Sequence, residues 1–150
     1  MHYYTLLYLS DYKIEDINDF VLESILDDFG DAFSDSLGER TPTVYDYCDW
    51  FEVGGRWAGA LKATKGIALS AQWAHGYDED EKLYNNECNG CNVEDVEEFH
   101  YPATLVINNQ MIFQHDDNDY YGQNADYREW ADKIKSKKIK GVLIVLDCHM

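Results

Sequence analysis

The stretch YDYCDWFEVGGRWAGAL, Tyr45–Leu61, is the most chemically specific part of the chain, and the rest is organised around it. It holds two of the four tryptophans of the chain, Trp50 and Trp57. Between them, the pair Gly54-Gly55 allows backbone angles that a side chain would block. We therefore expect a turn, a bulge or a close approach of another group at this pair.

Two interpretations of this stretch remain open. In the first, Arg56 grips a phosphate or carboxylate in two-pronged fashion beside exposed backbone N–H groups, and the tryptophans form a stacking wall for a ring. In the second, the glycines form a bulge, Arg56 pairs with a nearby acid and both tryptophans lie in the core. The stretch is not a phosphate loop or a dinucleotide fingerprint, because neither GxxxxGK[ST] nor GxGxxG occurs.

Outward from this stretch, apolar and aromatic runs bounded by turn residues predict strands. These are His2–Leu9, Val44–Val53, Trp57–Lys62, Gly66–Trp73, Ala103–Ile107, Gln110–Gln114 and Val142–Asp147. Apolar residues at helical spacing predict two helices, Ile14–Phe29 and Tyr127–Lys138, with Gly30 ending the first. Val93–Phe99 fits a single helical turn. Polar segments predict loops at Asp31–Thr43, Ala74–Cys91 and Asp116–Asn124.

This order of elements predicts one domain spanning residues 1–150, of the α+β class. We expect a mostly antiparallel sheet with two helices packed on one face. The hydrophobic fraction of 45% and the aromatic fraction of 15% are typical of a folded core. No apolar run approaches membrane-spanning length, and no secretory signal is evident, so a cytoplasmic location is expected.

The net charge of −17 is the strongest compositional feature, with 29 acidic residues against 12 basic ones. Such a surface repels nucleic acid and membrane phosphates, so we expect no direct binding to either. It attracts basic proteins at long range. The alternative is that the charge serves only solubility or adaptation to salt.

Two further motifs carry possible chemistry. Cys88-Asn-Gly-Cys91 has the spacing of a zinc knuckle, but no second CxxC completes a site, so we expect no cofactor and keep zinc as the alternative. Asp147 and His149 lie on the same side of an extended chain, where they could share a proton or hold a metal. They could equally belong to a frayed terminus in which Cys148 is buried.

At DWFEVGGRW, Asp49–Trp57, the sequence resembles an uncharacterised family of phage and bacterial proteins that carry a DWYxIGGRW-type stretch. The family also has a strand hairpin led by proline and a C-terminal VDCH-type motif. Pro102–Phe113 and Val145–Met150 fill those places here. The resemblance runs from about Tyr45 to the end. Phe51 departs from the usual tyrosine, and the loop Asn85–Cys91 is unfamiliar.

The resemblance implies a phage or prophage setting and brings no established activity. It also implies that two sequence-distant motifs meet in space, namely Gly54, Gly55, Arg56 and Trp57 with Asp147 and His149. Either Asp147 neutralises Arg56 as a structural pair, or Arg56 and His149 face an outside anion while Asp147 orients the imidazole.

Two functions from different classes follow. The first is a phage-encoded acidic protein in the infected cell that inhibits a basic, nucleic-acid-binding host defence factor, of the anti-CRISPR or anti-restriction type. The second is a nucleotide-binding or other small-ligand protein, or a small enzyme. Its pocket would use Trp50, Gly54, Gly55, Arg56, Trp57, Asp147 and His149. No GxSxG, HExxH or matched carboxylate pair occurs, so we name no catalytic residue.

Overall fold

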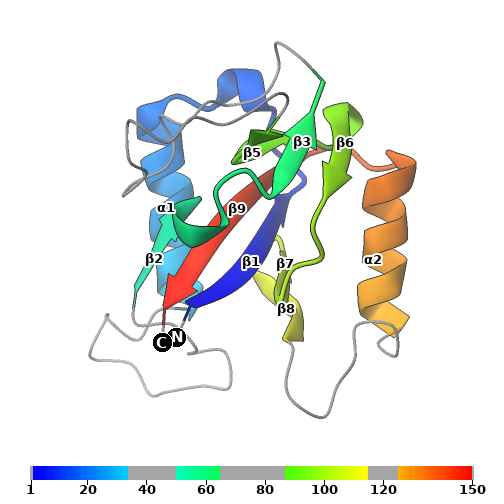
Figure 1. The fold of residues 1–150 in the computed structure, drawn as a ribbon. Coiled ribbons are helices and arrows are strands. Elements are labelled where there is room, and N and C mark those ends of the chain that lie inside the picture. Colours follow the sequence, from blue (N-terminus) through cyan, green and yellow to red (C-terminus); the bar gives the residue numbers. More distant parts are fainter. Residues whose placement is uncertain (1, 34–49, 65–86, 115–124, 150) are drawn as a thin grey trace.

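The computed structural model describes residues 2–33, 50–64, 87–114 and 125–149. Two helices flank a central twisted sheet, and a smaller sheet lies over one of its faces (Figure 1). The predicted α+β class and the mostly antiparallel pairing are confirmed.

The central sheet has six strands in the order β2-β9-β1-β7-β8, with β5 also paired to β9. Its members are β1 (His2–Leu9), β2 (Trp50–Val53), β5 (Gly90–Asn92), β7 (Thr104–Ile107), β8 (Gln110–Gln114) and β9 (Val142–His149). The pairing of β1 with β7 is parallel, whereas β1 pairs with β9 in antiparallel fashion along the whole length of both strands. The two chain ends therefore lie side by side (Figure 1).

The smaller sheet has three strands in the order β4-β3-β6. They are β3 (Leu61–Ala63), β4 (Glu87–Cys88) and β6 (Val96–Phe99). Short 3-10 turns in the described residues link elements of the fold: η1 (Ile14–Asp16), η3 (Gly55–Trp57) and η5 (Val93–Asp95).

The helices are α1 (Asp19–Phe33) and α2 (Ala125–Ser136), and they lie on opposite faces of the central sheet. Leu6 of β1 packs in the same cluster as Ala131 and Ile134 of α2. The next residue, Leu7, packs in the other cluster with α1. The prediction that both helices share one face is therefore wrong. An amphipathic helix shows that one side is buried, but its pattern does not say against which face of a sheet.

The start and end of α1 differ from the prediction of Ile14–Phe29. The side chain of Asn18 accepts a hydrogen bond from the Val21 N–H at 2.9 Å and caps the helix, so Ile14 belongs to the separate turn η1. Gly30 does not end the helix. The chain continues to Phe33, which is buried like Phe29 one turn earlier, so the burial of Phe33 outweighs the low helix propensity of glycine.

Three further boundaries are corrected. Trp57 lies in the turn η3 and not in a strand, and β3 begins only at Leu61. The expected turn Val93–Phe99 is a 3-10 turn followed by β6. The end of the expected loop Ala74–Cys91 forms β4 and the start of β5. The short polar strands lack the apolar alternation that marks longer ones, which explains why they were missed.

Several predictions are confirmed. The hairpin β7–β8 turns at Asn108 and Asn109, whose φ angles of 48° and 60° fit the tight turn expected of an Asn-Asn pair. The final strand is confirmed but extends to His149, two residues beyond the predicted Asp147. Asp147 and Cys148 are fully buried in it, so the expectation of a frayed terminus is wrong, while the expected burial of Cys148 is confirmed. The expected strand Gly66–Trp73, the loops Asp31–Thr43 and Asp116–Asn124, and residues 44–49 of the strand Val44–Val53 lie wholly or largely outside the described residues.

In the described part of the chain, no helix is both long and apolar enough to cross a membrane.

Candidate functional site

The edge of the central sheet changes partner at Val145 of β9. On one side of this residue β9 pairs with β2, and on the other side it pairs with β5. At the junction the carbonyl of Val145 accepts a hydrogen bond from Gly54 N–H, and its own N–H donates to the carbonyl of Asn89, both at 2.9 Å. The GGRW stretch and the Cys88–Cys91 stretch, distant in sequence, therefore meet at this point.

The glycine pair forms the turn that the sequence predicts. Gly54 has φ 74° and Gly55 has φ 53°, both in the left-handed region. Space is also tight, because a Cβ atom on Gly55 would lie 2.5 Å from Oδ2 of Asp147. The chain can leave β2 here and enter η3 only with glycine at this position.

Asp147 is fully buried and holds this turn in place. Its Oδ2 accepts a hydrogen bond from the backbone N–H of Arg56 at 2.9 Å. Its Oδ1 lies 2.9 Å from Nδ1 of His2, which donates to it across the paired strands β1 and β9. A buried carboxylate is stable only when charge and hydrogen-bond partners satisfy it, and these two groups contribute to that.

Arg56 and Asp147 lie in contact as predicted, but the guanidinium expected to make this contact does not make it. The contact uses the backbone N–H of Arg56, and within the described residues no ion pair joins its guanidinium to Asp147. Asp147 orients the imidazole of His2, a partner that the sequence did not predict. The ring of His149 meets the ring of His2 edge-on, with 4.8 Å between centroids. Trp50 begins β2, with its Cα paired to that of His149.

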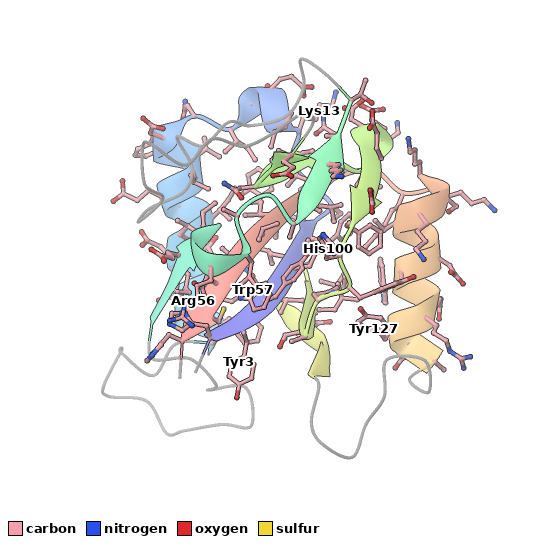
Figure 2. All side chains as sticks on the ribbon, viewed as in Figure 1. Tyr3, Lys13, Arg56, Trp57, His100 and Tyr127 are labelled. Carbon is pink, nitrogen blue, oxygen red and sulfur yellow. The ribbon has the colours of Figure 1, made fainter. Side chains whose placement is uncertain are left out.

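A pocket of about 540 Å³ opens beside this turn. Its walls come from η3 and the segment after it, from β4, and from the segment that follows β6. Its side chains are Tyr4, Arg56, Trp57, Glu87, His100 and Tyr101, with Ala58–Ala60 completing the wall. Figure 2 shows Arg56 and Trp57 on η3 in front of the β1–β9 pair, and His100 on the segment after β6.

Tyr4 of β1 lines this pocket and has an unsatisfied hydroxyl. The side chain is only 4% exposed, and the hydroxyl has no hydrogen-bond partner among the described residues. Burial raises the pKa of this phenol far above its usual value, and the neighbouring Tyr127 adds to the effect, so the hydroxyl stays protonated. The ring of Trp57 stacks on Tyr4 with centroids 5.7 Å apart and an interplanar angle of 29°.

The charges around the pocket differ from those of the whole molecule. Among the described residues, the guanidinium of Arg56, the imidazole of His100 and the carboxylate of Glu87 line it. The ammonium of Lys135 contacts the hydroxyl of Tyr101 and lies 4.5 Å from the centroid of its ring. In a chain of net charge −17, the described lining therefore has less negative charge than the average surface.

Asn89 connects the Cys88–Cys91 stretch to the pocket wall. Its side-chain Oδ1 accepts a hydrogen bond from the N–H of Gly59 at 2.9 Å. The thiols of Cys88 and Cys91 are fully buried and hydrogen-bond to each other, which lowers the pKa of Cys88 and raises that of Cys91. The described residues contain no group of three or more His, Cys, Asp or Glu side chains that could hold a metal. Zinc at this pair stays a prediction.

The sequence identified part of this pocket. Arg56 and Trp57 line it, whereas Asp147 and the glycines support it from behind. Tyr4, Glu87, His100 and Tyr101 were missed, because each belongs to an unremarkable segment until the fold places them together. A tyrosine in an apolar strand was the one available signal, since its hydroxyl must find a partner when buried.

Comparison with protein-family models, with curated proteins and with solved structures found no match for this chain.

Proposed function

We propose that this protein binds a small molecule in the pocket beside η3. The observation that carries the proposal is the buried hydroxyl of Tyr4, which has no partner among the described residues although its side chain lines the pocket. A hydroxyl left unsatisfied in this way costs about 1–3 kcal/mol of stability. Such a cost is retained where a function needs the group, and a ligand that hydrogen-bonds it recovers the loss.

The shape of the pocket supports the same proposal. Its volume of about 540 Å³ lies within the range of small-molecule sites, roughly 300–1,000 Å³. Its walls combine aromatic surface with a few polar groups, which is the composition that gives a ligand both contact area and orientation. The turn that carries Arg56 and Trp57 is fixed by the buried Asp147, so this wall is preformed.

Replacing Tyr4 by phenylalanine should leave the free protein as stable as the wild type, or more stable by up to about 3 kcal/mol, because it removes an unsatisfied hydroxyl. Tyr8 is the matched control. It lies on the same face of β1 and is equally buried, but its hydroxyl donates to the carbonyl of Lys140. Tyr8→Phe should therefore cost about 1 kcal/mol in chemical denaturation.

Ligand binding should affect the two variants in the opposite order from the stability of the free protein. Tyr4→Phe should lose most of the thermal stabilisation that a bound small molecule gives, whereas Tyr8→Phe should keep it. The measurement is thermal unfolding of both variants against a library of metabolites and nucleotides. If Tyr4→Phe is as destabilised as Tyr8→Phe, and no compound distinguishes the two, the proposal is wrong.

A second candidate function rests on the exposed side of α1, and here we propose recognition of a basic protein. This side carries five acidic residues and no basic one: Asp19, Glu23, Asp27, Asp28 and Asp31. Phe20 lies among them with its side chain 79% exposed. Acidic groups around an exposed aromatic anchor are suited to a basic partner with an apolar contact point. In the phage setting that the resemblance implies, this partner would be a nucleic-acid-binding defence factor in the infected cell.

Neutralising Glu23, Asp27 and Asp31 together to Gln or Asn should change stability by no more than about 0.5 kcal/mol, since all three are exposed. It should slow association with a basic partner and reduce the salt dependence of the rate. The control neutralises Asp126 and Asp132 on α2, on the opposite face. Association measured by biolayer interferometry with the candidate partner distinguishes them, and equal rates for both variants would exclude α1 as the interface.

A further inference from the structure

Aromatic surface is concentrated at the pocket. Among the described residues three large hydrophobic side chains are exposed, and two of them, Trp57 at 37% and Tyr101 at 48%, line this pocket. One face of Trp57 stacks on Tyr4, and its remaining exposed surface is available to a second ring. An exposed aromatic side chain in the lining of a pocket is suited to holding a flat ring by stacking.

Arg56 gives this ring site an anion-binding group. Its side chain is exposed, and its contact with Asp147 is made by the backbone N–H. The guanidinium is therefore not paired with this buried carboxylate. His100 lines the same pocket, and Lys135 is held over Tyr101 at its edge. Guanidinium groups bind phosphate and carboxylate groups in a bidentate manner, and more strongly than neutral donors do.

The surrounding charge makes this arrangement selective. A protein of net charge −17 repels anions over most of its surface, so an anion gains affinity only where cationic groups face it. Among the described residues that line the pocket, Arg56 supplies a permanent positive charge and Glu87 is the one carboxylate. A neutral ring would contact only the aromatic surface, and an anion without a ring would contact only the cationic side chains. Each would therefore bind more weakly than a molecule that has both groups.

Resting on the proposed small-molecule function, we propose that the ligand is a planar aromatic molecule that carries one anionic group. The ring stacks on Trp57, beside the ring of Tyr4, and the anion pairs with Arg56. A nucleoside monophosphate and an aromatic carboxylate share this chemistry.

Isothermal titration calorimetry on the full chain tests the ligand class with matched probes. Adenosine monophosphate carries ring and anion, adenosine lacks the anion, and ribose 5-phosphate lacks the ring. Indole-3-acetate and indole form the second pair, so the two series separate a phosphate source from a carboxylate source. In at least one series the probe that carries both ring and anion should bind at least about tenfold more tightly than each probe that lacks one of them.

Variants locate the binding. Arg56→Gln should reduce the affinity of the complete probe to that of its neutral counterpart, and Trp57→Leu should weaken both ring probes. Arg128→Gln, which neutralises an exposed arginine on α2 away from the pocket, should change nothing. Raising the salt concentration should weaken only the anionic probes.

The outcomes separate this proposal from the function on which it rests. Equal affinity of complete and neutral probes, or full binding to Arg56→Gln, overturns the anionic class. If neutral rings still bind in a manner that depends on Trp57, the small-molecule function survives that result. Binding of no probe at millimolar concentration also overturns the ligand class. If Tyr4→Phe is then as destabilising as Tyr8→Phe, the small-molecule function fails as well.

Discussion

Replacing Gly55 by valine should destabilise the folded protein by at least about 3 kcal/mol. Two effects add at this residue. The φ angle of 53° is costly for any L-residue with a side chain and most costly for a β-branched one. The new Cβ would also lie 2.5 Å from Oδ2 and 2.6 Å from Cβ of Asp147, which is buried and cannot move aside freely.

Gly30→Ala is the matched control for this substitution. Gly30 lies inside α1, and a Cβ there would approach the ring of Phe51 at 3.4 Å, which is an ordinary contact distance. Since alanine favours helix over glycine by about 1 kcal/mol, this variant should be neutral or stabilised. Urea denaturation of both variants measures the difference. A Gly55→Val protein with wild-type stability would show that the turn does not require glycine.

Removing the side chain of Asp147 should have an effect of similar size. Asp147→Ala leaves the N–H of Arg56 without its Asp147 acceptor and removes the contact of Asp147 with His2. It also leaves space in the buried region beneath η3. Each hydrogen bond to a charged group contributes about 1.5–3 kcal/mol, so losing these two should cost about 3–5 kcal/mol. Asp132→Ala, an exposed aspartate on α2, should change stability by no more than about 0.5 kcal/mol.

A double-mutant cycle tests whether His2 acts through Asp147. The two side chains form one contact, so the combined variant with His2→Ala should be less destabilised than the sum of the single variants, by about 1–3 kcal/mol. Additive effects would show that His2 and Asp147 stabilise the fold independently. The same cycle with Gly55→Val should also be non-additive, because Asp147→Ala removes the clash with Oδ2 but leaves the contact with Cβ and the backbone strain.

The sequence by itself determined the local features of this protein. Alternating and continuous apolar runs placed β1, β7 and β9, because a strand buried between two layers must be apolar on both faces. The Asn108-Asn109 turn was predictable, since few residues tolerate positive φ angles. The turn at Gly54-Gly55 followed from the same argument. Each of these depends on neighbours in the chain.

The tertiary structure alone decided what those features build. The parallel pairing of β1 with β7 and the change of partner along β9 join segments that are up to 100 residues or so apart, and no local pattern encodes such a pairing. The side of the sheet that each helix covers was equally hidden, because both helices are amphipathic. The contact between Asp147 and Arg56 was expected between charges, but the fold makes it through a backbone N–H.

The pocket shows the same division most clearly. Composition identified Arg56 and Trp57 as unusual, but Tyr4 was one aromatic residue among many in the first strand. Whether a buried hydroxyl finds a partner depends on which side chains the opposite layer places against it. That layer is built here by η3, β4 and the segment after β6, three pieces brought together only by long-range packing around β1 and β9.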